Sequence, residues 1–218
     1  MLEGKFSPRS SMNVKEKIAK TIEALNRHGF EASYVADRVE CRRLLLALIP
    51  PTASVGVPGS ASVRATGIVA ALREREQPVY DHWVEGLSRE ESLEIRRKQL
   101  LCDVLITSAN AVSATGEIVN MDGIGNRVAA TAFGPGRVIL VVGRNKIVAD
   151  LSAARRRIHR TAAPRRAKEL KMKTPCAKTG KCSNCNVPDR ICRAEIIMHR
   201  APSLTPTAVL IVDQDLGN

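Results

Sequence analysis

The sequence predicts an α/β protein with an open, mostly parallel β-sheet and helices on both faces, followed by a small cysteine-rich C-terminal segment. Two observations carry this prediction. Helical and extended hydrophobic patterns alternate strictly along the first two thirds of the chain, which is the order that builds parallel sheets. Aromatic residues make up only 3% of the 218 residues, so Val, Ile, Leu and Ala must form the core, as is typical of parallel sheets covered by helices.

The elements of the first half follow one another without long gaps. A helix begins near Val14, with Asn13 and Glu16 as a capping pair and Gly29 as its end. The next expected elements are a strand at 30–35, a leucine-rich helix that ends before Pro50, a strand at 53–57, a helix at 61–75, a short strand at 79–80, a helix at 88–101 and a strand at Val104–Thr107.

The second half contains more turns. Residues 108–125 are rich in small polar residues, and Thr115-Gly116 is typical of a tight hairpin turn. A helix at 127–133, a buried strand at 138–142 and a basic helix from Asp150 to His159 follow, and Pro164 marks a boundary. Short apolar runs at 196–198 and 208–212 are expected to add edge strands. The predicted domains are an α/β core at 1–163, a basic cysteine-rich metal-binding segment at 164–193, and C-terminal strands at 194–218 that return to the core.

Four cysteines lie within the eighteen residues from 175 to 192, in the pattern Cys-x5-Cys-x2-Cys-x6-Cys. Four thiolates this close in sequence can complete a zinc shell or hold an iron–sulfur cluster, and either group would order a segment with few apolar side chains. Disulfides are disfavoured because residues 1–13 contain no apolar run for export, which predicts a cytoplasmic protein. The predicted metal ligands are Cys176, Cys182, Cys185 and Cys192.

The spacing and the charge of this segment favour an iron–sulfur cluster, with zinc as the alternative. Structural zinc is usually held by two short Cys-x2-4-Cys pairs, and only Cys182 and Cys185 form such a pair. A cubane held by four thiolates carries a net negative charge. The cations that would offset this charge within the segment are Lys178, Lys181, Arg190 and Arg193.

The net charge of +12 is concentrated in the last third of the chain, where residues 151–200 hold fourteen Lys and Arg against three Asp and Glu. A nucleic-acid-binding surface is one interpretation, but this stretch has no aromatic side chain for base stacking and no known binding signature. Solvated helix faces and compensation of an anionic cofactor are the favoured interpretation. No stretch approaches the ~20 apolar residues of a membrane span.

Three loops follow predicted strands, at the edge where open α/β sheets bind ligands. The first has a glycine and two serines at a helix start, which suits an anion or a phosphate. The second combines asparagines, an aspartate and glycines, which favours a ligand site. The third is a glycine turn with an amide and two cations. The predicted ligand-binding residues are Gly59, Ser60 and Ser62 in the first loop, Ser108, Asn110, Asn120, Asp122, Gly123, Gly125, Asn126 and Arg127 in the second, and Gly143, Asn145 and Lys146 in the third.

With these motifs the sequence resembles the lactate-utilization (LUD) domain family. The resemblance is carried by residues 56–60 (Gly-Val-Pro-Gly-Ser), 107–111 (Thr-Ser-Ala-Asn-Ala), 120–127 (Asn-Met-Asp-Gly-Ile-Gly-Asn-Arg) and 141–146 (Val-Val-Gly-Arg-Asn-Lys). The cysteine-containing ending is similar to that of a stand-alone subgroup of the family. The resemblance implies the fold shared by ribose-5-phosphate isomerases, glucosamine-6-phosphate deaminases and coenzyme A transferases.

The resemblance also implies a role in oxidising lactate to pyruvate, in which such domains act beside iron–sulfur proteins. We therefore expect an accessory or electron-transfer subunit for lactate or a related 2-hydroxy acid, which binds a small anionic metabolite and redox partner subunits. The resemblance identifies no catalytic residue. The second loop is also similar to that of methylthioribose-phosphate isomerases, but Asn110 replaces their catalytic aspartate, and an amide cannot act as a general acid or base.

Two other classes of function stay open. One is a transferase or ligase that acts on a phosphate- or coenzyme-A-bearing metabolite, with zinc as a structural metal. Coenzyme A transferases of this fold use a glutamate nucleophile, and Glu117 is the nearest candidate in this sequence. The other is a nucleic-acid-binding regulator, which rests on the basic stretch alone.

Overall fold

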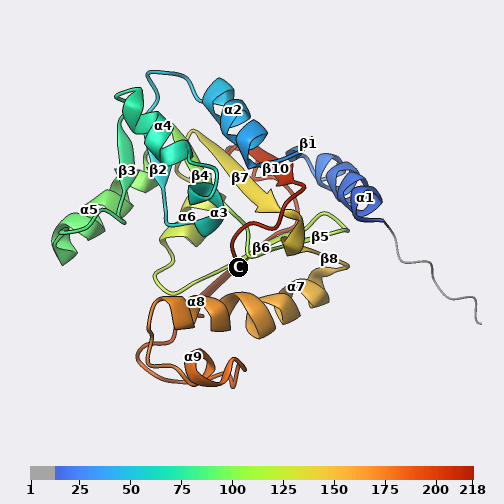
Figure 1. The fold of residues 1–218 in the computed structure, drawn as a ribbon, viewed down its shortest axis with the longest axis vertical. Helices are drawn as coiled ribbons and strands as arrows, with labels where there is room; N and C mark the ends of the chain where they lie inside the picture. The colour runs from blue at the N-terminus through green and yellow to red at the C-terminus, as the bar shows by residue number, and fades with distance from the viewer. Residues whose placement is uncertain (1–12) are drawn as a thin grey trace, which may run out of the picture.

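The computed structural model describes residues 13–218, and its centre is a six-stranded sheet (Figure 1). All neighbouring strands of this sheet are parallel, in the order β1-β10-β7-β4-β2-β3, which confirms the predicted fold class. The first twelve residues, on which the prediction about export rests, lie outside the described residues. The strands of this sheet are β1 (Glu31–Val35), β2 (Val55–Val57), β3 (Val79–Asp81), β4 (Val104–Thr107), β7 (Arg137–Gly143) and β10 (Thr207–Val212).

Helices cover both faces of the main sheet. Side chains of α2 and α4 share one hydrophobic cluster with Ile139 and Val141 of β7, and side chains of α1 and α6 share the other with Val138 and Leu140. This alternation along β7 is the two-residue period of a strand buried on both faces. The helices are α1 (Val14–Arg27), α2 (Arg38–Leu48), α3 (Ala61–Arg64), α4 (Ile68–Glu74), α5 (Arg89–Leu100), α6 (Asn126–Ala132), α7 (Leu151–Arg157), α8 (Ala163–Glu169) and α9 (Pro175–Thr179), with a 3-10 turn η1 (Arg144–Lys146) and a π-helical turn η2 (Ile158–Ala162).

A second sheet, which the sequence did not predict, lies between the main sheet and the basic helices. Its inner face packs on the main-sheet core through Val112 and Ile118, and its outer face packs on α7 through Ala111 and Val119. Figure 1 shows α7 and α8 beside this sheet, with α9 beyond them. The strands in spatial order are β8 (Ile147–Val148), β5 (Ala111–Ser113), β6 (Ile118–Asp122) and β9 (Ala194–Met198), and β5 and β6 form the hairpin predicted at Thr115-Gly116.

Two predicted helices differ from those in the structure. The helix expected at 61–75 is interrupted, because Gly67 adopts a left-handed conformation (φ 76°) between α3 and α4. The basic helix expected to end at His159 continues through η2 into α8. Pro164 lacks the N–H that would continue the α-helical ladder, and the hydrogen-bond register changes at the π-helical turn just before it.

Strand β10 lies inside the sheet, between β1 and β7, and not at the expected edge. All six of its residues are buried, and a continuous apolar run of this kind is typical of a strand covered on both faces. Strand β9 lies at the edge of the second sheet. No helix within residues 13–218 is long and apolar enough to cross a membrane.

Candidate functional site

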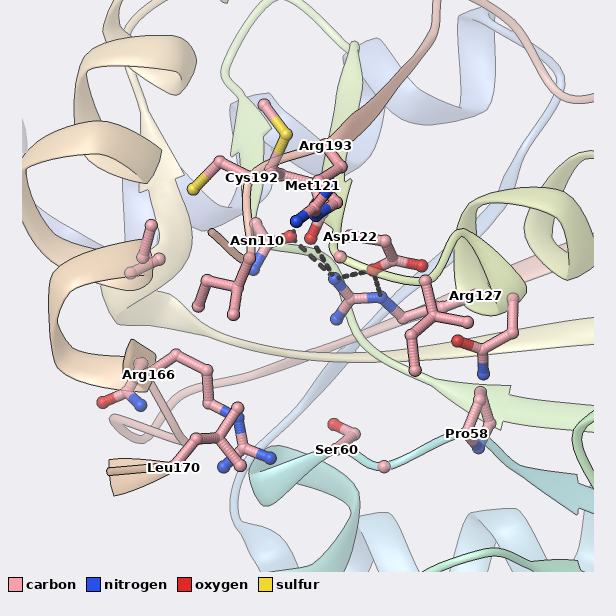
Figure 2. Close-up of a pocket in the computed structure, with 18 of the residues that line it drawn as sticks. Pro58, Ser60, Asn110, Met121, Asp122, Arg127, Arg166, Leu170, Cys192 and Arg193 are labelled. Carbon is pink, nitrogen blue, oxygen red and sulfur yellow. Dashed lines mark hydrogen bonds and ion pairs between the residues drawn. The ribbon is translucent and has the colours of Figure 1, made fainter. Parts of the chain in front are cut away.

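A cavity of about 480 Å³ opens at the carboxyl edge of the main sheet. Because the strands are parallel, the loops after β2, β3, β4 and β7 meet at this edge, and they form one side of the cavity. The opposite side comes from α8 and from residues 188–193, which lead into β9 (Figure 2). The predicted ligand-binding residues that line the cavity are Gly59, Ser60, Ser62, Ser108, Asn110, Asp122, Gly123, Asn126, Arg127 and Lys146.

Lys146, the last residue of η1, is a buried cation in the cavity wall, with only 4% of its surface exposed. Its Nζ atom donates hydrogen bonds to Ser62 Oγ at 2.8 Å and to Ser108 Oγ at 3.0 Å. Burial, and next the positive charges of Arg157 and Arg127, lower the pKa of Lys146 to about 7. The neutral amine is therefore well populated near neutral pH, which is unusual for a lysine.

Arg127 holds the second predicted loop in place. Its Nη2 atom lies 2.7 Å from Asp122 Oδ1, and the two side chains are only 14% and 9% exposed. The same nitrogen donates to Asn110 Oδ1 at 2.9 Å and to the carbonyl of Met121 (Figure 2). The second oxygen of Asp122 accepts a hydrogen bond from the Val128 N–H in α6. Within residues 13–218 the Nη1 atom of Arg127 has no hydrogen-bond partner, so it remains available to a ligand.

Trp83, in the loop after β3, lines the cavity between two guanidinium groups. Arg64 of α3 and Arg166 of α8 each lie 4.6 Å from the centre of the indole ring. Arg64 also donates to Asp81 Oδ1 at 2.6 Å, which fixes its position at the end of β3. Gly59 has a φ of 67°, and a Cβ there would come within 2.6 Å of Trp83 Nε1, so this position requires glycine.

Cations outnumber acids on the cavity wall. Burial, and next the charge of Arg96, lower the pKa of His82 to about 4, so this histidine adds no charge at neutral pH. The Arg190 and Arg193 guanidiniums donate mainly to backbone carbonyls, which leave their charge uncompensated. The charged residues that line the cavity are Arg96, Arg127, Lys146, Arg166, Arg190 and Arg193, against Asp122 and Asp189.

The four cysteines of the C-terminal segment line a second, smaller cavity next to α8 and α9. Cys176 is buried, Cys185 and Cys192 are half-buried, and Cys182 is exposed. Burial, and next the charges of the other three thiols, raise the pKa of Cys192 to about 11, while the charge of Arg190 acts in the opposite direction. The four sulfur atoms therefore lie within one electrostatic environment.

The four thiols that line this cavity are a donor set that suits a thiophilic metal. Within residues 13–218, no three His, Cys, Asp or Glu side chains stand close enough to hold one metal ion. Arg190 donates to the carbonyls of Cys185 at 2.6 Å and Cys192 at 2.7 Å and so orders the backbone that carries two of the thiols.

The two cavities share a wall. Both cavities are lined by Ala163, Arg190, Ile191 and Cys192. The smaller cavity with the four thiols therefore lies directly behind the 480 Å³ cavity. The shared wall lies close to the second predicted loop, since a Cβ on Gly123 would come within 3.2 Å of the Ile191 backbone. Figure 2 shows Cys192 and Arg193 beside Asn110 and Met121.

A family model for the LUD domain matches residues 18–212. The chain belongs to the LUD-domain family. This family is related to lactate utilization, and the match includes the parallel sheet and the cysteine segment. The fold is similar to the crystal structure of a DUF162 family protein from Deinococcus radiodurans, with a TM-score of 0.54 and 14% identity over 93% of this chain and 99% of that one. No curated protein matches the chain.

Four residues predicted to bind ligand lie outside the cavity wall of this LUD domain, and each has a structural role. Asn120 is fully buried, and its side-chain oxygen accepts a hydrogen bond from the backbone N–H of Asn110. The Asn145 side chain forms hydrogen bonds with the backbone of residues 216–217. Gly143 packs against the same segment, since a Cβ there would come within 2.5 Å of the backbone nitrogen of Leu216. Gly125 begins α6 with a φ of 92°.

Several residues of the cavity wall were missed in the sequence. His82 and Trp83 directly follow β3, so the rule that ligands bind beyond the ends of parallel strands would have found them. Arg166, Arg190 and Arg193 carry no such signal, because they reach the cavity only through the packing of α8 and the cysteine segment against the core.

Proposed function

We propose that this LUD-domain protein is an accessory or electron-transfer subunit in the oxidation of lactate or a related 2-hydroxy acid. It would bind a small anionic metabolite in the 480 Å³ cavity and an iron–sulfur cluster at Cys176, Cys182, Cys185 and Cys192. The observation that carries this proposal is that Cys192 lines both cavities. A ligand in the first cavity and a metal centre in the second would be separated only by their shared wall.

The charge of the cavity wall supports an anionic ligand. Five arginines and Lys146, whose pKa is about 7, line the cavity against two acids, and one of these acids, Asp122, is already paired with Arg127. A guanidinium donates strong, charge-assisted hydrogen bonds to a carboxylate, and the free Nη1 of Arg127 can supply one of them. Ser60 and Ser62, in the loop after β2, supply hydroxyl groups to the same cavity.

Residues of this chain would accept the protons that the oxidation releases, while partner subunits would accept the electrons. Oxidation of a 2-hydroxy acid to a 2-keto acid releases two electrons and two protons. Lys146, with its pKa near 7, can take up one of these protons inside the cavity. An iron–sulfur cluster supplies one-electron transfer when bound, so each turnover requires two transfers to a redox partner.

The metal is tested by purification without oxygen, followed by analysis of iron, sulfide and zinc and by an absorption spectrum. We expect iron and sulfide with a visible charge-transfer band in the native chain and loss of both in a Cys182→Ser, Cys185→Ser variant. Cys102→Ser is the matched control, because Cys102 is buried in the core, far from the cysteine segment in sequence. Zinc with a featureless visible spectrum would contradict electron transfer.

The ligand is tested separately by thermal denaturation with lactate and with pyruvate. A ligand that binds only the folded chain raises the melting temperature in a concentration-dependent way. We expect stabilisation in the native chain and its loss in Asp122→Ala, since this change releases Arg127 from the cavity wall. Equal stabilisation of both proteins would remove the second loop from the ligand site.

The size of the cavity favours a second candidate, a transferase or ligase for a phosphate- or coenzyme-A-bearing metabolite with structural zinc. A volume of about 480 Å³ lies within the range of sites for drug-sized ligands, about 300–1,000 Å³, which exceeds the needs of lactate. Glu117 does not line the cavity and accepts hydrogen bonds from Ser113 and Thr115 in the β5–β6 turn. Zinc in place of iron, with stabilisation by phosphate-bearing ligands only, would favour this candidate.

Internal contacts of the basic stretch weaken the case for a nucleic-acid-binding regulator. Arg155 pairs with Glu195 at 2.8 Å, Arg157 donates to backbone carbonyls, and Arg166 stacks on Trp83. These cations are used to attach α7 and α8 to the core. Retention of DNA or RNA that weakens steeply above ~50 mM salt would revive this class.

A further inference from the structure

Lys146 is a buried lysine whose hydrogen-bond partners are both neutral. Its Nζ donates to the hydroxyl oxygens of Ser62 and Ser108, and no carboxylate within residues 13–218 forms an ion pair with it. An ammonium group buried without a counterion is costly, so the neutral amine is favoured. The positive charges of Arg127 and Arg157 act in the same direction. A lysine made neutral by burial and by neighbouring cations is a nucleophile.

The hydrogen bonds around Lys146 leave the lone pair of this neutral amine free. The amine has two N–H groups, and the two serine hydroxyls accept them at 2.8 and 3.0 Å. Ser62 donates its own hydrogen to the Leu216 carbonyl at 3.0 Å, and Ser108 donates to the Ala109 carbonyl at 3.3 Å. Neither hydroxyl therefore donates to the nitrogen. Lys146 lines the cavity, so its lone pair is available to a bound electrophile.

We infer that Lys146 binds a 2-keto acid covalently, as an imine formed at the C2 carbonyl. The inference rests on the proposed function in one respect, because a 2-keto acid is the product of 2-hydroxy-acid oxidation. The cavity wall suits both parts of such a ligand. The free Nη1 of Arg127 and the adjacent cations are available to the carboxylate, while Lys146 meets the carbonyl carbon.

The step needs no oxidant or reductant. The Nζ lone pair forms a bond to C2, the carbonyl π bond breaks, and its oxygen takes a proton. The nitrogen loses a proton, and the resulting carbinolamine then expels its hydroxyl group, with one more proton, as water to give the C=N bond. The net change is amine plus ketone to imine plus water. Ser62 and Ser108 lie within hydrogen-bond distance of Nζ and can relay these protons.

Reductive trapping tests the inference. The native chain is incubated with pyruvate and sodium cyanoborohydride near pH 7, and the modified lysine is located by peptide mass analysis. We expect one reduced pyruvate adduct per chain, on Lys146, formed at least about tenfold faster than on surface lysines. At this pH a lysine with a pKa of about 7 is roughly a thousandfold richer in neutral amine than one near 10.4.

Two variants provide the controls. Lys146→Arg removes the nucleophilic amine and places a permanently charged guanidinium there, so the adduct should disappear. Lys17→Arg is the matched control, because Lys17 is also partly buried, burial lowers its pKa, and it donates to the Ile147 carbonyl at 2.6 Å without lining the cavity. This variant should label like the native chain. Should Lys146→Arg fail to fold, the labelled position in the native chain still decides the question.

The outcomes separate this inference from the proposed function. Stabilisation by lactate and pyruvate without an adduct on Lys146, or with adducts spread over surface lysines, would overturn the imine and leave the ligand site standing. Labelling of Lys146 in the Cys182→Ser, Cys185→Ser variant would support the imine even if the chain holds no iron. Labelling by a ketone that lacks a carboxylate, at the same rate as pyruvate, would overturn the assignment to 2-keto acids.

Discussion

The guanidinium of Arg166 lies 4.6 Å from the centre of the Trp83 ring, and this contact connects α8 to the loop that follows β3. The two residues stand on opposite sides of the cavity wall, one from the C-terminal helices and one from the main sheet. Arg64 covers the same ring at an equal distance. The stack therefore attaches the helix that precedes the cysteine segment to the ligand-binding edge of the core.

Arg166→Ala should change the tryptophan fluorescence and loosen the C-terminal segment. Trp83 is the only tryptophan in the sequence and is 37% exposed, so the tryptophan emission comes from this ring alone. Removal of Arg166 admits water to the ring and should shift the emission to longer wavelength, with a loss of roughly 0.5–2 kcal/mol of stability. Arg165→Ala, at the exposed neighbouring position, should leave the spectrum unchanged. Identical spectra for both variants would mean that the stack is absent in solution.

Gly59→Ala should displace Trp83, whereas Gly125→Ala should not. Both glycines have a positive φ, 67° and 92°, so each substitution introduces backbone strain of roughly 1–2 kcal/mol. Only at Gly59 does the new Cβ approach the indole, at 2.6 Å from Nε1, while nothing lies within 4 Å at Gly125. Tryptophan emission and ligand-dependent stabilisation should therefore change in the first variant only. Equal effects would show that strain alone, without a contact to Trp83, matters at position 59.

Asp122→Ala should destabilise the fold far more than Asp215→Ala. Asp122 and its partner Arg127 are almost fully buried, and removal of one partner from a buried pair costs about 3–5 kcal/mol. Asp215 is 70% exposed and pairs with Arg144, which keeps a second acidic partner, so less than about 1 kcal/mol is expected. Urea denaturation of the two variants measures the difference. Similar midpoints would mean that the Arg127 pair contributes no more than a surface pair.

Much of the main sheet could be predicted because its signals are local. The run from Val138 to Val142 is apolar throughout, and the predicted caps at Asn13 and Asp150 mark helix starts that the structure confirms. The loops of the cavity followed from one topological rule, that parallel strands present their carboxyl ends at one edge. Most of the predicted ligand residues in those loops line the same cavity for this reason.

The remaining features depend on long-range packing. Strands β5 and β8 contain three and two residues, too few to show a period, so the second sheet has no local signature. The position of β10 inside the main sheet is set by its pairing with β1 and β7, which are distant in sequence. The approach of Arg190 to the cavity likewise depends on how the cysteine segment folds back on the core.

The pH dependence of stability should reveal the charge state of Lys146. Burial lowers its pKa to about 7 in the folded chain, against about 10.4 when unfolded, so between these values the unfolded chain binds one more proton. The free energy of unfolding should therefore rise with pH above 7, by up to about 1.4 kcal/mol per pH unit. Below pH 7 both states hold the proton, and the full cost of the buried charge remains.

Lys146→Met removes this titration, so the difference in unfolding free energy between the native chain and the variant should grow from pH 7 to pH 9. Burial raises the pKa values of Cys41 and Cys102, an effect that opposes the rise above pH 9 but is the same in both proteins. Lys168→Met, at an exposed position in α8, removes a charge without this effect and should follow the native pH profile. If the native chain and Lys146→Met instead differ by a constant amount, Lys146 keeps its proton in the folded state. Its amine would then have no free lone pair for an imine at neutral pH.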